Sequence, residues 1–144
     1  MIEVHHVPLE WVPRTWPQVS GFVDDAVAYA ADGLTTEEIR IRVFDGAWRL
    51  FVAVEDGTIR GAAVVDVFNR CLDRVAFVVV IGGRLISNKD TFAQFKDLLV
   101  TTGATALEGA ARESVARLWT RYGFAEKHRI VGVSLWADQA PRNQ

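Results

Sequence analysis

Residues 75–83 read Val-Ala-Phe-Val-Val-Val-Ile-Gly-Gly, and this stretch decides the fold. Its apolar run has no polar face, which is typical of a strand covered on both sides, and the two glycines end it. A helix with an N-cap at Asn88 and a stop at Gly103 follows, and residues 104–110 then read as a second strand. This strand-helix-strand unit predicts a right-handed parallel crossover.

The N-terminal half supplies two helices. Apolar residues between Val19 and Ala30 fall on one helical face, which we expect to begin after Pro17 and to end at Gly33. Thr35 and Glu38 have the spacing of a capping box, so a second, short helix should follow and stop near residue 46.

A hairpin separates these helices from the apolar run. Residues 48–55 alternate with a period of two, Asp56-Gly57 is a strong turn signal, and residues 59–68 form the expected return strand. Gly61 is a candidate bulge position within it. Residues 2–7 read as a short first strand.

The C-terminal part predicts one more helix, over residues 113–122, and a last strand, over residues 128–136. The inward side chains of that helix are expected to be Val115, Leu118 and Trp119. The complete order of elements predicts an α+β domain with a mixed β-sheet and helices on both faces. We expect a single domain over residues 1–137 and a flexible tail over residues 138–144.

Composition excludes several classes of protein. Half of the 144 residues are apolar and the net charge is −2 without a basic block, so we expect no nucleic acid and no membrane as partner. The start of the chain predicts no signal peptide, and the single cysteine, Cys71, allows no intrachain disulfide, which fits a cytoplasmic protein. His5, His6 and His128 lack metal-ligand spacing, so no metal site is expected.

Residues 118–124, Leu-Trp-Thr-Arg-Tyr-Gly-Phe, resemble the Leu-Tyr-x-x-x-Gly-Phe ending of the helix after the fifth strand in the GNAT superfamily of N-acetyltransferases. The order of elements is similar to that superfamily as well. A narrower resemblance, over residues 11–135, is to GNAT-like proteins of tailed bacteriophages, and it rests on Trp16-Pro17, Leu34-Thr35-Thr36-Glu37 and Arg112. The resemblance implies the GNAT fold, acetyl-CoA as cofactor, and the cytoplasm of a phage host or the virion as location.

The resemblance also implies a cofactor site. Coenzyme A would enter a notch between the strands that end at Ile81 and at Ala110, held by backbone groups of Val79, Val80, Ile81, Gly82 and Gly83. Its phosphates would be contacted by Arg84, Ser87, Asn88 and Arg112. A helix N-terminus binds phosphate without a strict motif, but these residues have capping or ion pairing as their alternative role. The Arg/Gln-x-x-Gly-x-Gly/Ala spacing of active members is absent, and Asp90 adds a negative charge.

Two residues are candidates for proton transfer. Glu108, in the expected fifth strand, would deprotonate the amine if partial burial raised its pKa, and it would otherwise be a carboxylate facing solvent. The tyrosine that often serves the family as general acid is replaced by Trp119, whose indole N–H donates hydrogen bonds but cannot give its proton to a leaving thiolate. Tyr122 is a candidate replacement, with a core aromatic as its alternative role.

The sequence is consistent with two hypotheses. The chain is either an N-acetyltransferase, acting on a small-molecule or protein amine by direct attack, or an inactive GNAT-fold binding or assembly protein with a protein partner, such as a phage virion or host-interaction factor. A bulky side chain in the notch, such as Phe77 or Trp119, would contradict the first hypothesis. The exposed edge of a strand over residues 130–135 would let two copies pair as a homo-oligomer.

Overall fold

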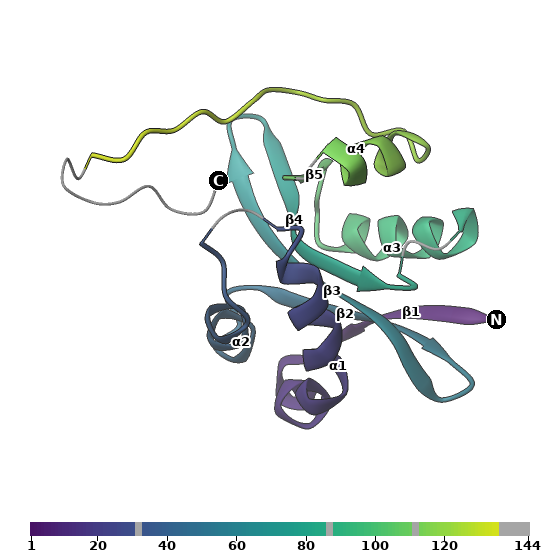
Figure 1. Cartoon of the computed structure of the whole chain (residues 1–144). Helices are drawn as coiled ribbons and strands as arrows, with labels where there is room; N and C mark the ends of the chain where they lie inside the picture. The colour runs from purple at the N-terminus through teal and green to yellow at the C-terminus, as the bar shows by residue number, and fades with distance from the viewer. Residues whose placement is uncertain (31–32, 86–87, 111–112, 136–144) are drawn as a thin grey trace.

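The computed structural model describes residues 1–30, 33–85, 88–110 and 113–135, with the backbone alone at residues 113–115. Its elements are β1 (Ile2–Val7), the 3-10 helix η1 (Leu9–Trp11), α1 (Val12–Val27), α2 (Thr36–Phe44), β2 (Arg49–Glu55), β3 (Thr58–Arg70), β4 (Asp73–Gly83), α3 (Lys89–Thr101), β5 (Ala106–Gly109) and α4 (Glu113–Thr120). The strands form one sheet in the order β1-β2-β3-β4-β5 (Figure 1).

The sheet is mixed, as the sequence predicts. β1 to β4 are antiparallel neighbours, and β5 lies parallel to β4, with α3 as the crossover between them. α1 and α2 cover one face, and α3 and α4 cover the other (Figure 1). Each face has its own core, built around Val19, Val23 and Ile39 on the first and around Phe51 and Phe95 on the second. Burial of these two apolar faces stabilises the three-layer arrangement.

Helix caps and turns predicted from the sequence are confirmed where they depend only on residues that are neighbours along the chain. The Thr35 hydroxyl accepts a hydrogen bond from the amide of Glu38 at 3.1 Å, and the Asn88 side chain accepts one from the amide of Thr91 at 2.9 Å. Both helices therefore begin with a side-chain cap. Asp56 and Gly57 have φ values of 50° and 76°, which is the left-handed pair that a two-residue hairpin turn needs.

The predicted start of α1 is wrong. The helix begins at Val12, with Pro17 inside it, and it ends at Val27, before the predicted stop at Gly33. Pro13, at the start of the helix, removes no helical hydrogen bond, and η1 leads directly into the first turn. Val12 and Trp16 are buried against the sheet, and this burial offsets the one bond that Pro17 removes.

The predicted C-terminal part is partly wrong. Leu118 is 45% exposed, whereas Trp119 is 7% exposed, because α4 packs with only the side that carries Trp119. No strand forms over residues 128–135: after Phe124 the chain runs across toward the β3–β4 hairpin instead of returning beside β5 (Figure 1). The side chain of Val115, residue 136 and the tail over residues 138–144 lie outside the described part. No helix within the described residues is long and apolar enough to cross a membrane.

Candidate functional site

The most distinctive feature of the sheet is the place where β4 and β5 separate. Their parallel pairing runs from Val75 and Ala106 to Val78 and Gly109, whereas β4 itself continues to Gly83. Opposite this point the register between β3 and β4 shifts, so that Val79 is left over as a bulge. The bulge reverses the alternation of side chains, so the residues on either side of Val79 face opposite cores.

A small cavity of about 30 Å³, called the notch below, lies at this separation. It is lined by Ala26, Tyr29, Ala30, Val78, Val79, Val80, Ile81, Ala110 and Trp119. Val79, Val80 and Ile81, which the sequence indicated for a cofactor site, line this cavity, and their contact with a cofactor stays a prediction. The sequence did not indicate that α1 and the turn after it also line the cavity. The small side chains of Ala26 in α1 and Ala30 in the turn permit this segment to lie close to β4.

Trp119 forms a wall of the notch. Its indole lies directly on Gly109, where an added Cβ would be only 2.6 Å from the indole Cζ3 atom. The indole also packs against the ring of Phe124, with centroids 5.2 Å apart. Trp119 is thus a bulky side chain at the notch, whereas Phe77 is not among the lining residues. The indole narrows the notch but does not fill it, because a cavity of about 30 Å³ remains beside it.

Gly82 and Gly83 are explained by close packing. A Cβ on Gly82 would lie 2.9 Å from the carbonyl oxygen of Phe22 in α1, and one on Gly83 would lie 2.3 Å from the carbonyl oxygen of Arg60. The amide of Arg84 donates to that same Arg60 oxygen at 3.0 Å. Only glycine permits these approaches, and the amide of Arg84 is already bonded within the protein.

The start of α3 is similarly occupied by internal contacts. Asn88 caps the helix, and Asp90 accepts a hydrogen bond at 3.0 Å from Gln94. The Gln94 amide also pairs with the backbone of Ile2 and Val4 along the outer edge of β1, at 2.9 Å each. Asp90 therefore orients a side chain that covers an open sheet edge. Ser87 and Arg112 lie outside the described residues.

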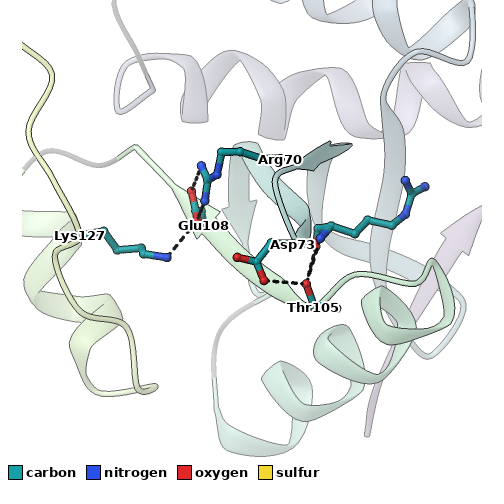
Figure 2. A network of polar contacts seen from close by, with 6 residues as sticks. Arg70, Asp73, Thr105, Glu108 and Lys127 are labelled. Atoms are coloured by element: carbon teal, nitrogen blue, oxygen red, sulfur yellow. Dashed lines mark hydrogen bonds and ion pairs between the residues drawn. The ribbon is translucent and has the colours of Figure 1, made fainter.

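Glu108 lies in β5 and is held by two cations (Figure 2). The Arg70 guanidinium donates to both carboxylate oxygens, one of these bonds measuring 3.1 Å, and the Lys127 ammonium lies 3.3 Å from Oε2. The hydrogen bonds from Arg70 lower the pKa of Glu108, burial opposes them, and Lys127 lowers it further. The expected raised pKa is therefore wrong, because cations from β3 and from the C-terminal segment outweigh burial.

Tyr122 lies beyond the end of α4 and away from the notch lining. Its ring packs against Phe92 of α3, with centroids 5.1 Å apart, in the aromatic group that also contains Trp119 and Phe124. This is the position of a core aromatic, which was the alternative role for Tyr122.

A larger cavity, of about 180 Å³, is lined by none of the predicted site residues. It is lined by His6, Val7, Leu9, Val12, Val43, Gly46, Trp48, Arg49 and Leu50. Burial, and to a lesser extent Arg49, lowers the pKa of His6 there. Among the described residues, no group of His, Cys, Asp or Glu side chains is arranged to hold a metal ion.

Neither a model of a known protein family nor the sequence of a curated protein matches this chain. Solved structures do match over nearly the whole chain. An aminoglycoside acetyltransferase from an uncultured soil metagenomic sample, in complex with sisomicin, has 11% identity and a TM-score of 0.65, covering 92% of this chain and 94% of its own.

Two further matches have closely similar values. An aminoglycoside N-acetyltransferase in complex with CoA has 14% identity and a TM-score of 0.66, with 95% of this chain and 96% of its own covered. A ribosomal-protein-alanine N-acetyltransferase from Brucella melitensis biovar Abortus 2308 has 14% identity and a TM-score of 0.64, with 93% and 99% covered. The chain therefore has the GNAT acyltransferase fold.

Proposed function

We propose that this chain binds acyl-coenzyme A, acetyl-CoA in the first place, in the notch and transfers the acyl group to an amine. The observation that carries the proposal is the early end of the β4–β5 pairing at Val78 and Gly109. Beyond it, the backbone edge of β4 that faces away from β3 has no strand partner in the described part of the chain. An extended arm with amide groups, as in coenzyme A, can pair with such an edge as a strand would.

The residues around the notch fit the pantetheine arm of coenzyme A better than its phosphate groups. The edge of β4 at Val79, Val80 and Ile81 suits the pantetheine arm. The phosphate end is less well provided for, because the Arg84 amide is already bonded and its guanidinium lies 3.7 Å from a carboxylate oxygen of Glu55. Arg84 and Lys89 would contact the phosphates as side-chain cations, and not through a cradle of free amides.

The bound thioester would supply an activated acyl group. In the proposed reaction the amine nitrogen bonds to the carbonyl carbon, the carbon–sulfur bond breaks, and the nitrogen loses a proton. Glu108 would be a poor acceptor for that proton, because Arg70 and Lys127 lower its pKa and it is not among the residues that line the notch, so the proton would pass to water. With Trp119 in place of a tyrosine and Tyr122 in the aromatic core, the leaving thiolate would take its proton from water.

The acceptor would be an amine on a small molecule or on a protein. The matched structures include aminoglycoside and ribosomal-protein N-acetyltransferases, so the same fold serves both kinds of acceptor in those proteins. Glu55 and Glu108 give no preference for a cationic acceptor, because each carboxylate already faces two cations.

A binding or assembly protein without acyl transfer is the second candidate. It is favoured by the Trp119 wall, which leaves only about 30 Å³ in the notch, and by the lowered pKa of Glu108. The resemblance to phage GNAT-like proteins suggests a virion or host-cell protein as the partner. In that case the cytoplasm of the host or the virion would be its location, and the exposed aliphatic residues of the C-terminal segment would be available for contact with a partner or a second copy.

Isothermal titration with coenzyme A and acetyl-CoA tests the first candidate. We expect a micromolar dissociation constant, about −8 kcal/mol. Ala30→Leu, which adds bulk to the notch lining, should weaken binding about tenfold or more, whereas the same change at the exposed Ala28 should leave it unchanged. Folded protein that gives no heat with either ligand would refute acyl-CoA binding and favour the second candidate.

A further inference from the structure

We infer that the indole of Trp119 sets the largest acyl group that the notch accepts, restricting it to the two-carbon acetyl group. This inference rests on the proposed binding of acyl-coenzyme A. It concerns which acyl chains the protein accepts, a property that the fold alone does not determine.

The position of the indole supports a role in selection. The acyl end of an arm lying along β4 would reach the point where β4 and β5 come together, next to Val78 and Gly109. Trp119 lies at that point: an added Cβ on Gly109 would be 2.6 Å and 2.9 Å from its Cζ3 and Cη2 atoms. The far ring of the indole therefore occupies the space into which a longer acyl chain would extend.

The indole is also held in place. It is 7% exposed and contacts both the Gly109 backbone and the ring of Phe124. Phe124 in turn packs on Phe92 of α3, with centroids 5.7 Å apart. Swinging the indole aside would break these contacts at once, so the wall has a fixed position in a closely packed interior.

The other lining side chains do not provide such a limit. Ala26, Ala30 and Ala110 are small, and Tyr29, the other large aromatic residue, is 57% exposed and free to turn into solvent. The remaining space of about 30 Å³ is enough for roughly one or two water molecules. A short acyl group would fill it, and each added methylene would meet the indole.

The test is a titration series with coenzyme A and its acetyl, propionyl, butyryl and hexanoyl thioesters. The proteins are the wild type, Trp119→Phe and Trp11→Phe. Phenylalanine keeps an aromatic ring against Phe124 but ends short of the far indole ring. Trp11 is 51% exposed in η1, outside the notch lining, so its variant is the matched control.

We expect wild type and Trp11→Phe to bind butyryl-CoA at least about tenfold more weakly than acetyl-CoA, the discrimination that one or two methylenes produce in a fixed pocket. In Trp119→Phe the two affinities should come within about threefold, with coenzyme A itself bound equally by all three proteins. Circular dichroism and a thermal melt establish that each variant is folded.

Two results would overturn the inference while acyl-CoA binding stands. One is wild-type protein that binds acetyl-CoA and butyryl-CoA equally, a result that needs no variant. The other is a folded Trp119→Phe variant with unchanged discrimination. Absence of binding to coenzyme A and to every thioester, in wild type and variant alike, would overturn both the inference and the proposed function.

Discussion

Gly109→Ala should destabilise the fold, and Trp119→Phe should relieve much of that effect. The new Cβ would lie 2.6 Å from the indole Cζ3 atom, which is far inside van der Waals contact. The indole cannot give way cheaply, because it is 7% exposed and packs on Phe124. The variant therefore forces a shift in a packed interior.

The magnitude follows from two opposing terms. Overpacking of a well-packed interior costs about 1–3 kcal/mol. Alanine within a strand stabilises the folded protein by about 0.5–1 kcal/mol relative to glycine, because it loses less backbone conformational entropy on folding. The net cost should be about 0–2.5 kcal/mol, with a central value of about 1 kcal/mol, which corresponds to a fall of roughly 3 °C in melting temperature for a chain of this size.

The effect is measured by urea and thermal unfolding of four proteins: the wild type, Gly109→Ala, Trp119→Phe and the double variant. In the Trp119→Phe background the added methyl should cost at least about 0.5 kcal/mol less than in wild type, the coupling expected of residues in contact. Gly132→Ala, whose Cβ would meet nothing within 4 Å, is the control for the substitution itself. Equal costs in both backgrounds would refute the contact between the indole and Gly109, and with it the position of the notch wall.

Three further predictions concern stability. Asn88→Ala removes the cap of α3 and should cost about 1 kcal/mol in urea unfolding; an unchanged midpoint would contradict the cap. Gly21→Ala should stabilise the protein by up to about 1 kcal/mol, because Gly21 is exposed in α1 and its Cβ would meet nothing within 4 Å; a lower midpoint would contradict this. Glu108→Gln should destabilise the protein at pH 7, and its difference from wild type should shrink as the pH falls below about 4.5, the ordinary pKa of a glutamate. The folded-state pKa lies below that value, so the stabilisation by Arg70 is present above it and is lost on acidification; a difference that stays constant between pH 7 and pH 3 would contradict the ion pair.

The secondary structure of the first two thirds of the chain was largely predictable. The caps at Thr35 and Asn88 and the turn at Asp56-Gly57 depend on contacts within four residues, so the local sequence decides them. The central β4 was predictable because its neighbours on both sides require an unbroken apolar run. Pro17 shows the limit of such reasoning, because burial of distant surface outweighs a local helix-breaking residue.

The candidate site was predictable only in outline. The sequence indicated Val79, Val80 and Ile81 as one wall, because an apolar strand that ends in glycines has a recognisable position in the fold. It did not reveal that Ala26 and Ala30 of the α1 region complete the cavity, nor that Gly82 and Gly83 serve close packing. These are contacts between segments that lie roughly 20 to 60 residues apart in sequence.

What the sequence by itself determined is the set of strands and helices up to α4, their caps and turns, and the parallel β4–β5 unit. The tertiary structure alone decided that Arg70 and Lys127 converge on Glu108, that Trp119 lies on Gly109, and that residues 128–135 do not pair with β5. The reason is physical: helix and turn signals act over a few residues, whereas charge neutralisation and packing depend on which distant surfaces meet, and no local pattern carries that information.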